Sequence, residues 1–306
     1  MSSALAAARH ALVAVCEPLR ETLRVRGSDA QSWLNGLVTA DLAPLARGAG
    51  VFALLLNKQG KVQTDLDLLP SSEGVVLGVA GGRVEGVREM LERYLVMEDA
   101  ELEVLPGVGW VRLLGPSASR VAAELAAFDG VRAAGALDWL GIGGAALLAD
   151  ASRVTAVAEA AARHAGDAAR VASASDWEAL RIAHGFPAFG VDYGPEDNPH
   201  EASLERRAVS FSKGCYLGQE VVCMQDMRGK LKRRLAVLRL ASPESGEPER
   251  EVFAAGIAEP VGRVTSMAFD GATPIALARL KAPFFEGTAE LRVGQRRAEI
   301  VAQSPH

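Results

Sequence analysis

Cysteine is scarce in this sequence, and the few cysteines do not form a recognisable set. Three occur in 306 residues, at positions 16, 215 and 223, and none belongs to a CxxC pair. An odd number of cysteines without a CxxC pair suggests neither a disulfide framework nor a zinc knuckle, and only a single disulfide between Cys215 and Cys223 stays open. We therefore exclude a disulfide-stapled secreted scaffold, expect a reducing, cytoplasmic compartment, and predict no metal site.

Other common signals are absent as well. No apolar run approaches the roughly 20 residues that a membrane-spanning helix needs, so no membrane partner is expected. Gly81 and Gly82 precede an expected helix, but the chain lacks the GxGxxG fingerprint and P-loop lysine of a phosphate cradle. The net charge of −5 disfavours non-specific coating of nucleic acid. The alanine-rich N-terminus is interpreted as an ordinary first helix rather than a signal peptide.

The order of the expected elements predicts an α+β fold. Strand-like runs at 51–56 and 61–69 flank Asn57-Lys58-Gln59-Gly60, a four-residue hairpin turn. Strands and helices then alternate without a strict βαβ rhythm. From residue 232 the helical periodicity vanishes, and short strands indicate a small antiparallel β-barrel. We expect an α+β region over 1–230, with two subdomains that meet near residue 116, and a barrel domain over 231–306.

Two acids in the second hairpin strand are the first candidates for chemistry. Strand alternation places Asp65 and Asp67 on one face and Thr64 on the other. A carboxylate beside a ligand amine can accept its proton or stabilise its cation. The alternative is that these acids are the polar face of a half-exposed strand.

A segment rich in proline, glycine, aspartate and asparagine, 185–202, follows the last expected helix before the cysteine segment. We predict a long, ordered surface loop there, and loops of that length are often functional. Its charged residues match no metal-ligand spacing, so we interpret them as solvated loop charges.

The strongest chemical signal is the run KGCYLGQE at 213–220. Cys215 lies between two glycines, two residues after Lys213, and a helix is expected to start just after Gly218. A nearby ammonium and the positive end of a helix both favour a thiolate, the reactive form of cysteine. The alternative is that Cys215 is a small buried hydrophobe, as most free cysteines are.

This run resembles the signature K-G-C-Y-x-G-Q-E of the YgfZ family, the folate-binding, iron–sulfur-related relatives of the glycine cleavage system T-protein, GcvT. The segments 23–42, 57–62, 189–192 and 261–266 resemble further landmarks of that family in the expected order. Together they cover nearly the whole chain. The resemblance implies a GcvT-like multi-subdomain frame around a central cleft, followed by the barrel.

The resemblance also implies site residues. Cys215 would be the functional thiol and Lys213 would favour its thiolate. Asp65 would lie beside a bound tetrahydrofolate or related reduced folate, and Glu201 falls at a P-x-E-A step of the family. Arg228 opens a basic run, 228–239, suited to the glutamate tail of a folate or to an RNA backbone. The remaining residues of the motif loop would be Gly214, Tyr216, Gly218, Gln219 and Glu220.

Two positions depart from the T-protein pattern. A pair of adjacent aspartates becomes Thr64-Asp65, and the glutamate of an R-x-E-A-G segment, which the resemblance places on the pterin ring, becomes Ala183. A carboxylate can accept two hydrogen bonds from a pterin edge, whereas alanine accepts none. Either Glu178, His184 or a loop residue substitutes for that glutamate, or folate binds weakly or not at all. Whether the protein is an enzyme stays open.

The implied function is support of iron–sulfur cluster assembly or repair in client proteins, with a reduced folate bound and a transient cluster as a further ligand of the thiol. Two alternatives remain. One is a tetrahydrofolate-dependent aminomethyl or methyl transferase. The other is a factor associated with tRNA modification, although the basic run has no interleaved aromatic residues for stacking bases.

Overall fold

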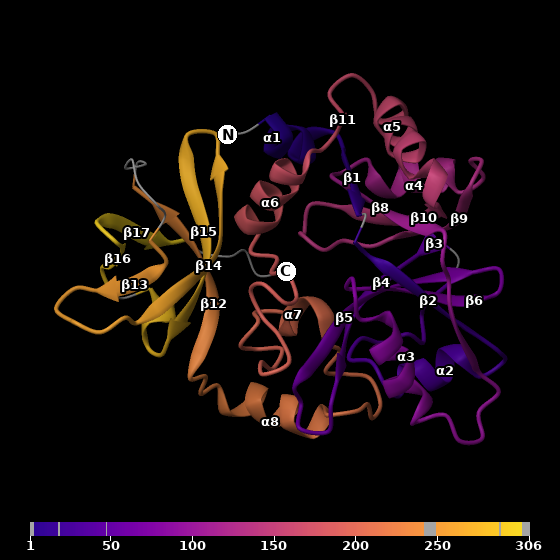
Figure 1. Cartoon of the computed structure of the whole chain (residues 1–306), viewed down its shortest axis with the longest axis horizontal. Coiled ribbons are helices and arrows are strands. Elements are labelled where there is room, and N and C mark those ends of the chain that lie inside the picture. The colour runs from indigo at the N-terminus through magenta and orange to yellow at the C-terminus, as the bar shows by residue number, and fades with distance from the viewer. Residues whose placement is uncertain (1–2, 18, 47, 242–248, 288, 302–306) are drawn as a thin grey trace.

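The structure, a computed structural model, describes residues 3–17, 19–46, 48–241, 249–287 and 289–301. Two β-sheets and a β-barrel are joined by a central segment of helices and loops (Figure 1). The barrel lies on one side and both sheets on the other. This arrangement confirms the expected mixed α and β fold with a C-terminal barrel.

The first sheet has five strands in the order β4-β5-β6-β2-β7, paired antiparallel throughout. Helices α2 and α3 pack their apolar residues against one face of this sheet. Leu66 and Leu68 of β5 belong to that face. The expected hairpin at 57–60 joins β4 to β5. The elements are β2 (Glu21–Arg26), α2 (Ala30–Asn35), β4 (Val51–Leu56), β5 (Val62–Ser71), β6 (Gly74–Val79), α3 (Val84–Glu92) and β7 (Glu101–Val104).

The second sheet has six strands in the order β11-β1-β8-β10-β9-β3, and its helices α4 and α5 pack on one face. The expected first helix stops at His10, because Val13 begins a strand that pairs with β8 and β11. The elements are α1 (Ser3–His10), β1 (Val13–Glu17), β3 (Gly48–Ala49), β8 (Val108–Leu114), α4 (Ala118–Leu125), β9 (Val131–Ala136), β10 (Gly144–Asp150), η1 (Ala151–Arg153), α5 (Val154–Ala165) and β11 (Arg170–Val171).

The expected subdomain boundary near residue 116 crosses this second sheet. Strands β1 and β8 precede it, whereas β9 and β10 follow it, and β8 pairs with β10. The division of 1–230 into two subdomains at that residue therefore stays a prediction.

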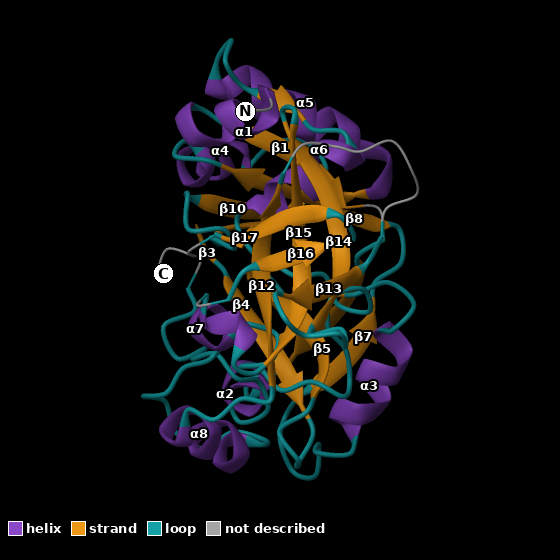
Figure 2. Cartoon of the chain, turned by 90° about the vertical axis from the view of Figure 1, so that its left-hand side faces the viewer, coloured by secondary structure: helices purple, strands orange, loops and turns teal. Residues whose placement is uncertain are grey.

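The C-terminal strands form a closed antiparallel barrel in the order β12-β15-β14-β13-β16-β17 (Figure 2). Its interior is filled by aliphatic side chains such as Leu238, Val264 and Leu280. The elements are β12 (Arg233–Leu240), β13 (Glu251–Ala254), β14 (Gly262–Asp270), β15 (Thr273–Lys281), η2 (Phe284–Glu286), β16 (Leu291–Val293) and β17 (Arg296–Ile300).

Helices α6 (Ala174–Ala183), α7 (Glu205–Ala208) and α8 (Gln219–Arg228) belong to the segment between sheets and barrel (Figure 1). The expected loop at 185–202 is present, but only part of it lies at the surface, so the interpretation of its charges as solvated was wrong for three residues. Asp192, Asp197 and His200 in it are buried. Buried backbone N–H groups need acceptors, and the loop provides them itself, since Ala188 N–H donates to Asp192 and Gly194 N–H to Asp197.

Asp192 joins this loop to the barrel. It is 0% exposed. One carboxylate oxygen accepts from the Arg181 guanidinium at 2.7 Å, and the other accepts from the hydroxyls of Thr265 and Ser266 on β14, the latter at 2.7 Å. Arg181 also donates to Ser266 at 2.8 Å. Helix α6, the loop and the barrel therefore meet at one buried ion pair.

Replacing Asp192 by asparagine should destabilise the protein strongly. Removing one partner of a buried ion pair leaves the other charge uncompensated and costs about 3 kcal/mol or more. The measurement is the free energy of unfolding in urea. A matched control is Asp129→Asn, whose side chain is 84% exposed in its pair with Arg153 and should cost below about 1 kcal/mol. Similar losses in both variants would contradict the assignment.

Candidate functional site

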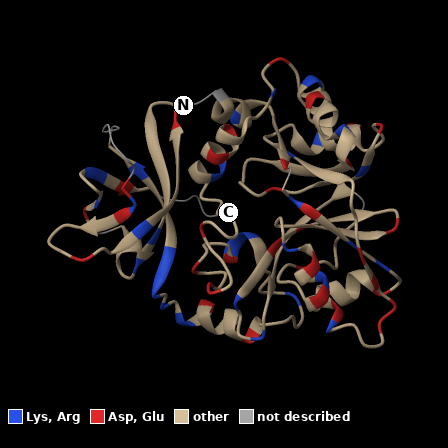
Figure 3. Cartoon of the chain, viewed as in Figure 1, with Lys and Arg blue, Asp and Glu red and all other residues tan. Residues whose placement is uncertain are grey.

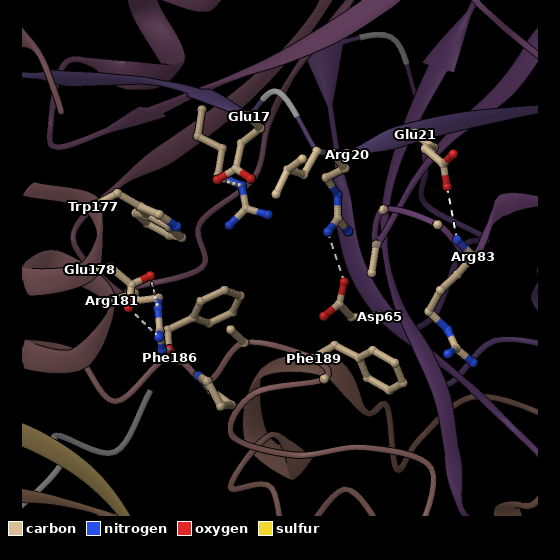
Figure 4. Close-up of a pocket in the computed structure, with 18 residues that line it drawn as sticks. Glu17, Arg20, Glu21, Asp65, Arg83, Trp177, Glu178, Arg181, Phe186 and Phe189 are labelled. Carbon is tan, nitrogen blue, oxygen red and sulfur yellow. Dashed lines mark hydrogen bonds and ion pairs between the residues drawn. The ribbon is translucent and has the colours of Figure 1, made fainter. Parts of the chain in front are cut away.

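A cavity of about 770 Å³ lies where the two sheets meet α6 and the loop that follows it. Its walls come from the β1–β2 connection, Asp65 of β5, residues 80–83 before α3, Arg112 of β8, and parts of 177–190. Cavities of roughly 300 to 1,000 Å³ hold small molecules. Figure 4 shows charged and aromatic side chains of the wall on opposite sides of this space.

Asp65 lies in the wall and shares one arginine with Asp67. The Arg20 guanidinium is 2.9 Å from Asp65 Oδ1 and 2.6 Å from Asp67 Oδ2, and it donates to Gly78 O at 2.9 Å. Burial opposes the charge of Arg20, but the carboxylates of Asp67 and Asp65 outweigh it and raise the Arg20 pKa above its ordinary value. Arg20 therefore stays a cation and holds both acids on one face of β5.

The second oxygen of Asp65 accepts from the Tyr193 hydroxyl at 2.7 Å. Burial, followed by the nearby Asp65 carboxylate, raises the pKa of Tyr193 well above its ordinary value, so this hydroxyl remains a donor. Asp65 is 6% exposed and Asp67 is 1% exposed. The interpretation of these acids as the polar face of a half-exposed strand was therefore wrong.

Thr64 lies on the opposite face of β5 from Asp65, as strand alternation requires. It is buried and is not among the residues that line the cavity. The departure from the paired aspartates therefore changes the far side of the strand, and the cavity keeps its carboxylate.

Aromatic rings and Arg112 form one side of the cavity. The Arg112 guanidinium carbon lies 5.0 Å from the Trp177 ring centre and 5.8 Å from that of Phe186, both of which line the cavity. Glu178, on the same side, is paired with Arg181 (Figure 4). Ala183 does not line the cavity, whereas Glu178 does, so Glu178 is the carboxylate of α6 available there.

Arg83 and Phe189 lie across the cavity from Trp177 (Figure 4). The Arg83 guanidinium carbon is 4.9 Å from the Phe189 ring centre, within the range of a cation–π contact. The Phe189 ring meets the Tyr193 ring edge-on, with centres 5.4 Å apart. Tyr193 therefore fixes both Asp65 and the aromatic platform beneath Arg83.

The cysteine motif lies outside the cavity, because none of its residues lines it. Cys215 is exposed and free. Gln219 and Glu220 begin α8, which starts where the sequence indicated. Cys223, on α8, is partly buried and also free. The exposed thiol excludes the interpretation of Cys215 as a buried hydrophobe.

Lys213 is bound to the segment after α2. Its ammonium donates to the carbonyls of Asn35 at 2.6 Å, Val38 at 3.0 Å and Ala40 at 2.6 Å. Burial lowers the pKa of Lys213 to about 8. None of the contacts described for this ammonium reaches Cys215, so its role in favouring the thiolate stays a prediction.

Tyr216 and Gly218 shape the motif loop. The Tyr216 hydroxyl is buried and has no hydrogen-bond partner among the described residues. Gly218 has φ +81°, and a Cβ there would lie 2.6 Å from the Asn57 carbonyl oxygen of the β4–β5 turn. The motif thus packs directly on the turn of the hairpin that carries Asp65.

Two other predicted ligand residues lie outside the cavity lining. Glu201 is 3.2 Å from the Arg233 guanidinium and 3.7 Å from the Lys61 ammonium. Arg228 is exposed at the end of α8. Their roles in folate binding stay predictions, and the structure places only Asp65 of the three in the cavity wall.

Basic residues gather at the end of α8 and the start of β12 (Figure 3). Arg233 and Arg234 are held by acids, at 2.9 Å from Asp197 and 2.5 Å from Glu205. Lys230 and Lys232 are exposed. The free part of the basic run is therefore smaller than the sequence indicated.

Within the described ranges, no three or more His, Cys, Asp or Glu side chains come together as a metal site would require. No helix in that part of the chain combines the length and apolar character needed to cross a membrane.

A family model for the GCVT N-terminal domain matches residues 13–159. These residues are similar in sequence to that domain. The match spans the first sheet and most of the second, and it includes Asp65, Arg83 and Arg112 of the cavity wall.

The chain is also a distant homologue of YgfZ proteins. It is 25% identical over 226 residues to the tRNA-modifying protein YgfZ of Colwellia psychrerythraea, covering 71% of this chain and 68% of that protein. It is 28% identical over 219 residues to the YgfZ of Yersinia enterocolitica, covering 68% of this chain and 65% of that protein. The chain thus matches about two thirds of the length of these relatives.

The GcvT-like fold extends over the whole chain. The glycine cleavage system aminomethyltransferase T of Bartonella henselae superposes with a TM-score of 0.77 and 19% identity, covering 99% of this chain and 88% of that one. At this identity the likeness shows the fold alone.

Sequence reasoning missed most of the cavity wall. Arg20 and Arg112 carry no motif, and their partners are distant in sequence, 45 residues away in both Arg20–Asp65 and Arg112–Asp67. Arg83 had one available signal, because it follows Gly81 and Gly82 at a strand-to-helix connection. That pattern was judged only as a phosphate cradle.

The two motif glycines should differ in their tolerance of alanine. Gly218→Ala should lower the free energy of unfolding by about 2 kcal/mol or more, since a side chain at positive φ is strained and its Cβ would meet the Asn57 carbonyl. Gly214→Ala should change it by less than about 0.5 kcal/mol, because a Cβ there meets nothing within 4 Å. Urea unfolding checks both, and equal effects would contradict the packing described.

Proposed function

We propose that this is a cytoplasmic YgfZ-like protein that binds a reduced folate in the cavity and supports assembly or repair of iron–sulfur clusters in client proteins through Cys215. The observation that carries the folate part is the buried Asp65 carboxylate, which lies in the cavity wall between an aromatic side and the Arg83 side. The exposed Cys215 in the K-G-C-Y-x-G-Q-E loop supports the thiol part.

The cavity residues suit a tetrahydrofolate. Trp177 and Phe186 offer aromatic faces to a reduced pterin, and Glu178 can accept hydrogen bonds from its N–H groups. Both Asp65 oxygens already accept one hydrogen bond each, and each has a further lone pair for a ligand amine. The folate would supply the reactive nitrogens and the carried one-carbon group. Asp65 would orient them, and the cavity walls would limit access of water.

The folate assignment predicts that replacing Asp65 by asparagine weakens folate binding, whereas the same replacement at Asp67 does not. Asp65→Asn should weaken tetrahydrofolate binding about tenfold or more, which is about 1.4 kcal/mol, because an amide cannot stabilise a ligand cation. Asp67→Asn is the matched control. It shares Arg20 and the same strand face but does not line the cavity.

Asp67→Asn should instead lower stability, with little effect on affinity. Anaerobic calorimetric titration with tetrahydrofolate and urea unfolding measure the two quantities. Equal affinity losses in both variants, or no binding to the unmodified protein, would remove the folate assignment.

A resident iron–sulfur cluster does not fit the described residues, because they bring no three metal-binding side chains together. A cluster handled by this protein would be substrate, held between Cys215 and ligands of a client. An exposed thiol on a loop fixed by Lys213 and Gly218 suits such an exchange with a partner protein.

Complementation tests the thiol. In a bacterium that lacks its YgfZ-type protein, this chain should restore the activity of iron–sulfur enzymes, and its Cys215→Ser variant should not. Cys16→Ser is the control, since Cys16 is a half-buried residue of β1 and its variant should rescue fully. Equal rescue by the Cys215 variant would contradict a role for the thiol.

Two other functions remain candidates. A tetrahydrofolate-dependent aminomethyl or methyl transferase is supported by the retained Asp65, because Thr64 lies on the far face of β5. A tRNA-modification factor is supported by the name of the YgfZ relatives and by the exposed Lys230 and Lys232. Neither function explains the exposed cysteine loop as directly as the proposed iron–sulfur role does.

A further inference from the structure

Four arginines line the cavity, and three of them are matched by acids. Arg20 is paired with Asp65 and Asp67, Arg112 with Glu17 and Asp67, and Arg181 with Glu178 and Asp192. The fourth, Arg83, makes no ion pair with any described residue, and its Nε is buried without a hydrogen-bond partner.

Glu21, which Figure 4 shows on the same side of the cavity as Arg83, already accepts from the backbone. One oxygen of Glu21 accepts from the backbone N–H of Arg83 at 3.0 Å and of Val84 at 3.2 Å. These N–H groups form the start of α3, where a carboxylate compensates the positive end of the helix. The Arg83 guanidinium is therefore left as an unmatched cation in the wall of the cavity.

This cation is held in place before any ligand binds. The guanidinium lies over the Phe189 ring, and Phe189 is in turn fixed edge-on by Tyr193, whose hydroxyl donates to Asp65. An arginine fixed in this way loses little rotamer freedom when it binds a planar carboxylate, and its N–H fork matches the two carboxylate oxygens.

The order of groups across the cavity narrows the choice of ligand. Figure 4 shows Trp177, Glu178 and Phe186 on one side, Asp65 in the middle, and Phe189 with Arg83 on the other. A folate carries, in the same order, a pterin, reactive nitrogens, a benzoyl ring and a carboxylate tail. Arg228, expected from the sequence to bind that tail, does not line the cavity.

We infer that Arg83 binds the glutamate-tail carboxylate of the folate and that Phe189 packs against its p-aminobenzoyl ring. This inference rests on the proposed folate binding and extends it. The Arg83 side of the cavity then distinguishes a complete folate from a reduced pterin compound that lacks the amino-acid tail.

Anaerobic calorimetric titration with tetrahydrofolate and with tetrahydropteroate, which lacks the glutamate, tests this. The unmodified protein should bind tetrahydrofolate about tenfold tighter or more, the scale of one charge-assisted hydrogen bond. Arg83→Gln should bind both compounds with the weaker affinity, and Arg83→Lys should recover part of the preference. Arg163→Gln, on the exposed face of α5, should keep the full preference.

The titrations distinguish the proposed folate binding from the inferred role of Arg83. If the unmodified protein binds both compounds equally well, the inference is overturned while folate binding stands. If Arg83→Gln keeps the full preference, or Arg228→Gln alone abolishes it, the tail lies elsewhere and the inference is again overturned. If neither compound binds, the proposed function and the inference fall together.

Discussion

The ion pairs of Arg20 with Asp65 and Asp67 are the interaction on which the junction of the two sheets depends. Two carboxylates on one face of a buried strand would be prohibitively costly without a cation between them. Asp67 also accepts from Trp139 at 2.7 Å and from Arg112 of the second sheet at 3.3 Å. These charged groups therefore connect the two sheets. They also give the cavity a polar wall at a place where apolar side chains could otherwise fill it.

The β4–β5 hairpin carries one site along its length and supports the other at its turn. Asp65 points into the cavity from β5, while the turn at Asn57 and Gly60 packs against Gly218 and Val221. The proposed ligand site and the proposed thiol site therefore lie at different surfaces of one hairpin.

Local chemistry made part of this structure predictable. The hairpin turn, the start of α8 after Gly218 and the barrel all follow from signals within a few residues. The burial of 185–202 did not, because Asp192 is satisfied by Thr265 and Ser266, more than 70 residues later. The resemblance singled out Asp65 and Cys215 as candidates, but it did not predict that Lys213 would bind the Asn35 carbonyl, 178 residues earlier. The roles of Arg20 and Arg83 could not be predicted from the sequence, because their partners are distant in the chain and only the fold brings them close.

The walls of the cavity come from widely separated parts of the chain, and this has a consequence for synthesis. Domains generally fold as units from the N-terminus while the chain is still being made. Both sheets are complete by residue 171, yet the cavity also needs residues 177–190. Arg181 and Asp192, in turn, reach their full set of partners only once β14 exists. Nascent chains that end before residue 177 therefore carry a sheet framework without a complete pocket wall, and chains that end before the barrel leave Arg181 and Asp192 without their β14 partners. A ligand for that pocket would stabilise only molecules that contain the complete wall, by mass action.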